Sequence, residues 1–236
     1  MQLRITMQAQ NGLDIPLSYN HQVQSAIYAK LREVGESDFW HDSGYVNGKV
    51  FKSFVFGSLC GKYTVQDKRI NFRDEITLEI RSPIPAFCDT LQRSFELSPR
   101  IKFVQTVLDV TDIQTGNLHI NTDSAVFTAQ SPVIAYSTDE NKRRYFFGPE
   151  DDVFIGMVTK NYEHKYLAVT GQNPDEILIE PLGRHRRVAT YFKQSRLLGW
   201  KGDYRISGSS KALEFIYNTG LGSKNSQGFG LLQQKN

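Results

Sequence analysis

The chain has 236 residues, of which 39% are hydrophobic, 12% aromatic and 22% charged. This is the composition of a globular protein, and it excludes disordered, collagen-like and coiled-coil chains. No stretch reaches the roughly 18 consecutive apolar residues of a membrane span, and the N-terminal segment alternates polar with apolar residues where a signal peptide would be apolar. We therefore expect a cytoplasmic protein without a membrane segment, built from two domains of ordinary size.

The cysteines and the distribution of charge bear on the partners. Cys60 and Cys88 have neither the spacing of a zinc site nor the density of a disulfide framework, so we expect two buried thiols and no metal. Residues 184–236 hold ten Lys and Arg against two Asp and Glu, a net charge of +8, whereas residues 1–183 carry −5. This asymmetry favours a polyanionic ligand for the C-terminal part, and a solvated basic face without a ligand is the alternative.

Hydrophobic periodicity predicts a β-α-β-β-α-β order in the first half of the chain. Residues 2–10 alternate as a strand with one buried face, and a loop with Gly12 and Pro16 follows. From Asn20, apolar residues recur every three and four positions, which predicts a helix with Asn20 as its N-cap and Gly35 at its end. The remaining expected segments are a loop over 36–49, a strand over 50–57, a turn at 60–62, strands over 63–70 and 76–80, a helix opening at Pro83 and Pro85 with a stripe of Phe87, Leu91, Phe95 and Leu97, and a strand over 101–110.

This order is that of the ferredoxin-like unit, and of an RRM, in which two helices cover one face of an antiparallel sheet. The pattern partly recurs from residue 116. The second set of expected elements comprises strands over 118–129, near 177–179, and over 187–192, 202–207 and 229–233, with helices over 149–166 and 209–218. We therefore predict an α+β fold of two tandem ferredoxin-like (RRM-like) domains with antiparallel sheets, over residues 1–115 and 116–236.

The most informative segment runs from Gly220 to Gly230, between a predicted helix and a predicted strand. Its four glycines would let the backbone approach a ligand and offer N–H groups to phosphate oxygens. The spacing is not that of a P-loop or a dinucleotide fingerprint, both of which lie between a strand and a following helix. A Gly-rich turn by itself is a weak signal, so its neighbours in the sequence matter.

Three segments together resemble the Cas6 family of CRISPR repeat-processing endoribonucleases. They are the Gly-rich loop, Tyr-Asn-His at residues 19–21, and Ser-Pro-Val at residues 131–133. The resemblance covers nearly the whole chain and is most specific from residue 198 to residue 232. It implies two ferredoxin-like domains and metal-independent cleavage of precursor CRISPR RNA within each repeat, which leaves a 2′,3′-cyclic phosphate upstream and a 5′-hydroxyl downstream.

The resemblance also implies a cleavage site on and just after the first helix, where His41 is the expected catalytic residue, with Tyr28 and Lys49. In this reaction a 2′-hydroxyl loses a proton, the 5′ oxygen gains one, and charge builds on the phosphate between them. Histidine can serve either proton transfer, lysine can neutralise the charge, and Tyr28 can orient or deprotonate the nucleophile. Without the resemblance, His41 is more often a packing residue, Tyr28 a half-buried helix residue and Lys49 a solvated charge.

Basic clusters with interleaved aromatic residues favour RNA binding, chiefly through phosphates. We expect most of the aromatic residues, which are Tyr191, Phe192, Trp200 and Tyr204, in the core and most Arg and Lys outside. With the Gly-rich loop, the expected RNA contacts are His21, Lys142, Arg143, Arg144, Arg184, Arg186, Arg187, Lys193, Arg196, Lys201, Gly220, Gly222, Lys224, Asn225, Ser226, Gly228, Phe229 and Gly230. The expected partners are precursor CRISPR RNA and other CRISPR-associated proteins of an interference complex. We expect a monomer or homodimer with no cofactor.

Two other functions stay open. A Cas6-like protein that binds repeat RNA without cutting it would keep the same basic face and Gly-rich loop. An RRM-type RNA-binding regulator is a more distant alternative, but the K/R-G-F/Y-G/A-F-V-x-F/Y string of an RRM does not occur in the sequence. His41 in the expected loop favours the nuclease, and an activity assay separates it from the binding protein.

Overall fold

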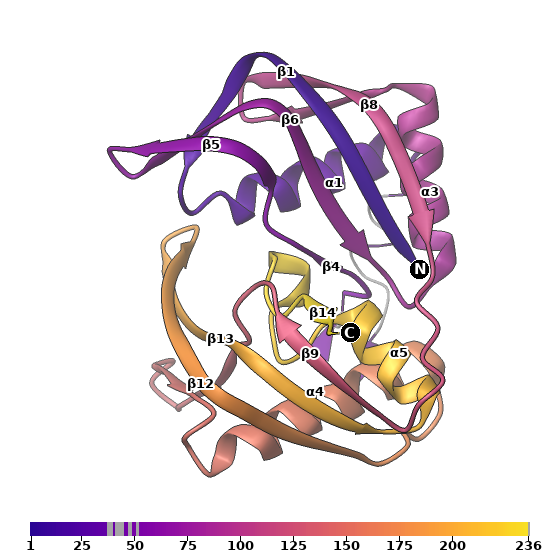
Figure 1. Cartoon of the computed structure of the whole chain (residues 1–236), viewed down its shortest axis with the longest axis vertical. Helices are drawn as coiled ribbons and strands as arrows, with labels where there is room; N and C mark the ends of the chain where they lie inside the picture. The colour runs from indigo at the N-terminus through magenta and orange to yellow at the C-terminus, as the bar shows by residue number, and fades with distance from the viewer. Residues whose placement is uncertain (37–39, 41–44, 47–48, 51, 236) are drawn as a thin grey trace.

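The computed structural model describes residues 1–36, 40, 45–46, 49–50 and 52–235, with the backbone alone at 45–46 and 49–50. Two α+β halves lie one above the other, and each is built on an antiparallel sheet (Figure 1). The predicted fold class is confirmed. None of the helices that the structure describes combines the length and the apolar composition needed to cross a lipid bilayer.

The N-terminal half has a six-stranded sheet in the order β4-β6-β1-β8-β7, and β5 pairs with β6. A ferredoxin-like sheet has its first strand between its third and fourth, and β1 lies between β6 and β8 in the same way. Helices α1 and α3 contact each other beside this sheet. The bounds are β1 Gln2–Pro16, α1 Asn20–Glu33, β2 Tyr45–Val46, β3 Lys49–Val50, β4 Val55–Phe56, β5 Cys60–Gln66, β6 Arg69–Arg81, α3 Pro85–Leu97, β7 Arg100–Phe103 and β8 Thr106–Gly116.

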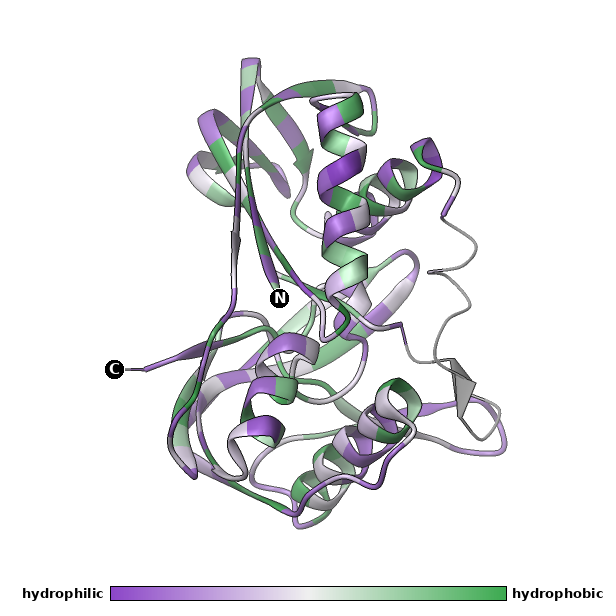
Figure 2. Ribbon diagram, turned by 90° about the vertical axis from the view of Figure 1, so that its right-hand side faces the viewer, coloured by the Kyte–Doolittle hydropathy of each residue, from purple (hydrophilic) through white to green (hydrophobic). Residues whose placement is uncertain are grey.

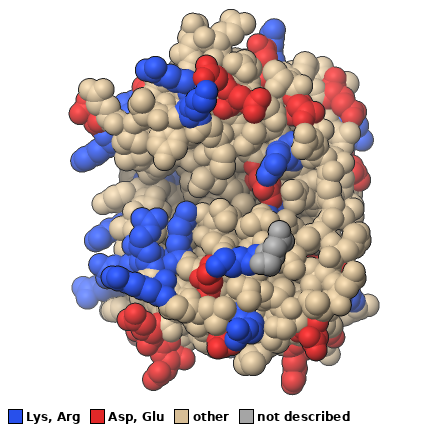
Figure 3. Space-filling model, in the orientation of Figure 1, with Lys and Arg blue, Asp and Glu red and all other residues tan. Residues whose placement is uncertain are grey.

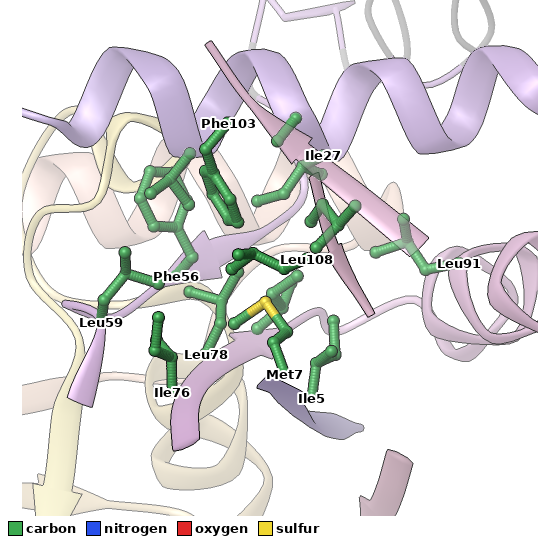
Figure 4. Packing of buried hydrophobic residues seen from close by; sticks show 14 of the residues in the cluster. Ile5, Met7, Ile27, Phe56, Leu59, Ile76, Leu78, Leu91, Phe103 and Leu108 are labelled. Atoms are coloured by element: carbon green, nitrogen blue, oxygen red, sulfur yellow. The ribbon is translucent and has the colours of Figure 1, made fainter. Parts of the chain in front are cut away.

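The core of this half follows directly from the two periodicities of the sequence. Alternate residues of β1, including Ile5 and Met7, point to the same side of the sheet, because side chains alternate along a strand. Ile27 of α1 and Leu91 of α3 meet them there, and all four are buried (Figure 4). Both helices are thus held on the sheet by one apolar stripe each.

The C-terminal half has a four-stranded sheet in the order β12-β13-β9-β14, which repeats the arrangement of the first half. Helix α4 contacts β12, and helix α5 contacts β13. The helices of both halves carry polar and apolar residues in alternation along their length (Figure 2). A separate hairpin joins β10 to β11. The bounds are β9 Ser124–Ala129, β10 Ala135–Thr138, β11 Arg144–Phe147, α4 Val153–Thr170, β12 Ile177–Phe192, β13 Ser195–Gly208, α5 Ser210–Thr219, the 3₁₀ turn η1 Asn225–Gln227 and β14 Leu232–Gln234.

Several strands are longer than predicted, β1 and β12 among them. β1 continues past residue 10 to Pro16, and the register shifts between Ala9 and Leu13. Gly12 lies within that irregularity with φ +78°, a conformation that glycine adopts at little cost. β12 likewise runs unbroken over Ile177–Phe192, where two short strands were expected.

One turn was misplaced and another was missed, because residues other than glycine make them. The chain reverses between β5 and β6 at Asp67 and Lys68, which have φ +49° and +62°, so the turn expected at 60–62 was wrong. The expected strand 101–110 is the hairpin β7–β8, whose turn contains Val104 at φ +55°. A valine with positive φ is uncommon, and the sequence therefore read as a continuous strand.

Three local predictions for side chains were also wrong. Leu97 is 70% exposed, so the stripe of α3 ends at Phe95. Cys60 is exposed on β5, whereas Cys88 is buried as expected and burial raises its thiol pKa to about 11. The N-cap of α1 is Tyr19, and the side chain of Asn20 binds elsewhere.

Buried polar contacts join the two halves. Arg81, the last residue of β6, donates to the backbone oxygens of Tyr217 and Leu232, at 3.2 and 2.5 Å from Nη1. Its guanidinium carbon lies 3.6 Å from the centre of the Tyr217 ring, and the Tyr217 hydroxyl donates to Gln2. Because Arg81 has no exposed surface, these contacts fix α5 and β14 against the N-terminal sheet.

Candidate functional site

Helix α1 presents Tyr28 toward the segment that leads into β4. The Tyr28 ring is half-buried and packs edge-on against Phe54, with 5.9 Å between ring centres. Lys52 lies on the same ring, with Nζ 5.0 Å from its centre. A phenol and an ammonium group therefore lie together where the sequence predicted the cleavage site.

Of the other predicted catalytic residues, His41 lies outside the described residues. Lys49 is in β3, and only its backbone is described. Lys52 was missed by the sequence analysis, although it lies within the strand predicted over 50–57. The apolar run of Phe54, Val55 and Phe56, which are all buried, could have indicated that this segment enters the core.

Two neighbouring hollows share Lys52 in their lining. The larger, which we call the α4 hollow, has a volume of about 820 Å³ and is lined from α4, β10 and the Gly-rich loop. The smaller, which we call the β13 hollow, has a volume of about 390 Å³ and lies at the β12–β13 turn. Both are lined by Lys52, Lys224, Ser226 and Gln227.

The charge of these hollows has one sign. The described residues that line them include no Asp or Glu. Their cationic side chains are Lys52, Lys160, Lys165 and Lys224 in the α4 hollow, and Lys52, Arg144, Lys193 and Lys224 in the β13 hollow. A lining of this kind raises the local concentration of a polyanion and suits a phosphate backbone.

The Gly-rich loop lies against helix α1 of the other half. Asn20 Nδ2 donates to the carbonyl oxygens of Gln227 and Gly228, at 2.9 and 3.3 Å. One turn further along α1, Gln24 Nε2 donates to the Ser226 carbonyl at 2.7 Å. These bonds bring the loop within reach of Tyr28, although the two segments are about 200 residues apart in the sequence.

The structure corrects the reason given for the glycines of this loop. Gly220, Gly222, Gly228 and Gly230 are buried, and so is Phe229, whereas Lys224, Ser226, Gln227 and the mostly buried Asn225 line the α4 hollow. Gly228 has φ +88°, and a Cβ there would meet Asn20 and the Phe56 ring at 2.6 Å. The four glycines therefore allow close packing within the protein, and polar residues between them line the hollow.

A buried lysine and a buried asparagine hold the loop from inside. Asn225 Nδ2 donates to the carbonyls of Leu221 and Phe229, at 3.2 and 3.0 Å. Lys165 of α4 donates to Asn225 Oδ1 at 3.1 Å and to the Gly220 carbonyl. Burial lowers the pKa of Lys165 to about 7, because desolvation disfavours the charged form.

The predicted basic face lies mainly on β12 and β13. Arg and Lys side chains gather on the lower left of the molecule in Figure 3, where Figure 1 draws these two strands. The exposed residues of the prediction are Lys142, Arg143, Arg144, Arg184, Arg186, Arg187, Lys193 and Arg196. Lys201 is half-buried, and burial together with the nearby Arg186 lowers its pKa. Of this set, Arg144 and Lys193 also line the β13 hollow.

Only two of the four aromatic residues of the basic face lie in the core, where most of them were expected. Phe192 and Tyr204 are buried, Trp200 is half-buried and Tyr191 is 51% exposed. His21, at the start of α1, packs edge-on against Phe192 with 5.6 Å between ring centres. Burial, together with the nearby Lys193, lowers the pKa of its imidazole. His21 therefore joins α1 to the β12–β13 turn, next to the β13 hollow.

Comparison with known proteins identifies the family. Residues 115–234 match the family model described as CRISPR associated protein Cas6, C-terminal. A CRISPR-associated endoribonuclease-like protein named Cas6nc, from Pyrococcus horikoshii, is 24% identical over 234 residues, which cover 93% of this chain and 92% of that protein. The CRISPR-associated endoribonuclease Cas6 1 of Methanocaldococcus jannaschii is 22% identical over an alignment of 253 positions, which covers 98% of this chain and 92% of that protein.

The fold agrees with these matches. A solved structure described as an RAMP protein binding different RNA substrates aligns with a TM-score of 0.85 at 23% identity, and the alignment covers 100% of both chains. The tandem sheets, with their common strand order, therefore occur in a known RNA-binding protein. Because the family model also matches more than half of the residues, the chain belongs to the Cas6 family.

Proposed function

We propose that this chain is an endoribonuclease that binds CRISPR repeat RNA and cleaves precursor CRISPR RNA within the repeat. One observation carries the proposal. Lys52, whose ammonium lies on the Tyr28 ring, lines two hollows that contain cationic side chains and, among their described residues, no carboxylates. An RNA strand that follows both hollows would pass its backbone over this pair. The names of the relatives in the same family support the activity.

The cleavage would proceed by attack of the RNA's own 2′-hydroxyl on the adjacent phosphorus. This forms a 2′,3′-cyclic phosphate, breaks the bond from phosphorus to the 5′ oxygen, and leaves a 5′-hydroxyl once that oxygen has gained a proton. The nucleophile belongs to the substrate, so the reaction needs no metal-bound water. We assign proton transfer to His41 and orientation of the nucleophile to Tyr28.

Neutralisation of the phosphate falls to Lys52 or Lys49. Lys52 is favoured because its ammonium group lies on the Tyr28 ring. Removing a preorganised positive charge at this point would slow the chemical step more than it weakens binding, since charge on the phosphate oxygens is greatest in the transition state. The other cations of the hollows would bind phosphates of the same strand outside the reacting linkage.

The replacement His41→Ala tests the proposal against the non-cleaving alternative. General acid–base catalysis contributes about 10²- to 10⁴-fold, so single-turnover cleavage of repeat RNA should slow by that factor while affinity changes little. The matched control is His119→Ala, since His119 is exposed on the C-terminal half. A wild-type chain that binds repeat RNA and never cuts it would favour the binding protein, and His41→Ala cutting at the original rate would remove His41 from the mechanism.

A further inference from the structure

The α4 hollow contains side chains that the proposed cleavage does not use. Met157, Lys160, Asn161 and His164 line it from α4, and Tyr136 lines it from β10. Residues three and four apart share one face of a helix, so the four residues of α4 form one continuous wall. Residues of the Gly-rich loop and Lys52 line the same hollow.

Asn161 has hydrogen-bonding capacity that the described chain does not use. Its Oδ1 is buried and has no hydrogen-bond partner. A buried acceptor without a partner is destabilising, and most such groups in folded proteins are satisfied. A half-turn about the last side-chain bond exchanges Oδ1 with Nδ2, so the amide can present either an acceptor or a donor to the hollow.

Tyr136 supplies an aromatic surface in the same hollow. Its ring is half-buried, tilted against Phe146, and covered by the ammonium of Lys224 at 4.9 Å from the ring centre. A base could take the place of this ammonium, which would then be free to pair with the phosphate of the same nucleotide. The volume of about 820 Å³ lies within the roughly 300–1,000 Å³ of ordinary ligand sites.

We propose that the α4 hollow is a nucleotide-binding subsite for single-stranded RNA on one side of the cleaved linkage. The base lies against Tyr136 and the Asn161 amide, and its phosphate lies against Lys160 and Lys224. The strand continues past Lys52 into the β13 hollow, which takes the RNA on the other side. This assignment rests on the proposed function for its substrate, and it adds a base-contacting site that the cleavage mechanism does not require.

The test measures binding to two fluorescein-labelled oligomers, each about ten nucleotides long, which matches the site size of single-strand binding modules. One is an adenosine homopolymer, and the other has the same sugar–phosphate backbone without bases. Tyr136→Leu removes the aromatic surface and Asn161→Leu removes the amide. The matched control is Tyr145→Leu, because Tyr145 is exposed on the same hairpin and does not line the hollow.

Tyr136→Leu should weaken binding of the adenosine oligomer by roughly five- to a hundred-fold, because base stacking is lost. Asn161→Leu should weaken the same binding by about two- to ten-fold, because one hydrogen bond is lost. Neither replacement should change binding of the abasic oligomer. Lys160→Ala should weaken binding of both oligomers, because it acts on the phosphate. Tyr145→Leu should change neither.

A second readout separates a ligand site from a structural role. Because the buried Asn161 oxygen has no partner, Asn161→Leu should keep or raise the midpoint of thermal unfolding while it weakens binding. The inference fails if Asn161→Leu and Tyr136→Leu bind the adenosine oligomer like the wild type, if they weaken the abasic oligomer equally, or if the wild type does not bind the adenosine oligomer. These measurements require no cleavage, so a wild type that never cuts repeat RNA would refute the proposed function and leave this result standing.

Discussion

The replacement Asn225→Ala tests whether the Gly-rich loop is held from inside the protein. Asn225 is 7% exposed, and its side chain makes three hydrogen bonds, to Leu221, Phe229 and Lys165. Each bond contributes about 0.5–1.5 kcal/mol net, and the partners left unsatisfied in a buried site add to the loss. We expect the free energy of unfolding to fall by about 3 kcal/mol, which for a chain of this size lowers the midpoint of thermal unfolding by roughly 6–12 °C.

Urea unfolding followed by circular dichroism measures this change. Asn141→Ala is the matched control, because Asn141 is exposed at the turn of the β10–β11 hairpin, and it should change stability by less than about 0.5 kcal/mol. Affinity for RNA should fall with Asn225→Ala as well, since Lys224 and Ser226 on either side line both hollows. A loss of stability below about 1 kcal/mol, or one equal to that of Asn141→Ala, would refute the internal bracing.

Three further replacements test separate parts of the structure. Gly228→Ala should lower the free energy of unfolding, measured in urea, by about 2–4 kcal/mol, because the added Cβ would meet neighbouring atoms at 2.6 Å. Gly171→Ala, at φ +68° with open space around it, should lower it by only about 1 kcal/mol, and equal losses would contradict the packing argument. Burial lowers the pKa of Lys165 from an ordinary 10.5 to about 7, so between these pH values the unfolded chain holds a proton that the folded chain has lost. The free energy of unfolding should therefore rise with pH across this window, by at most about 1.4 kcal/mol per pH unit, and Lys165→Met should remove this part of the slope. Identical slopes for the two proteins would refute the argument. Lys52→Ala should slow single-turnover cleavage more than Lys49→Ala, and the opposite order would return the charge-neutralising role to Lys49.

Hydrophobic periodicity was sufficient to predict the fold class, because the buried residues of each helix or strand recur with the period of that element. The alternation around Ile5 and the helical spacing around Ile27 both correspond to side chains of one core. The errors came at positions where backbone conformation departs from residue preference. Val104 has positive φ in the β7–β8 turn although it is not glycine, and Gly12 lies in an irregularity of β1 and does not end that strand.

The candidate site was only partly visible in the sequence. The Gly-rich loop could be found from its composition, but its contact with Asn20 spans more than 200 residues and leaves no local pattern. The same holds for Lys165, which reads as an ordinary charged residue of α4 and is buried beneath the loop. Such contacts arise from how separate elements pack in three dimensions, and periodicity within one element carries no information about them.

The central claim is cleavage of RNA by its own 2′-hydroxyl. The most direct measurement incubates the protein with repeat RNA from an array in the same genome, in excess EDTA, and maps both ends of the products. We predict one cut within the repeat, a 2′,3′-cyclic phosphate upstream and a 5′-hydroxyl downstream. Replacing the single 2′-hydroxyl at the cut by hydrogen should abolish cleavage and leave binding intact. Cleavage that disappears in EDTA and returns with Mg²⁺, or that persists in the 2′-deoxy RNA, would contradict the account.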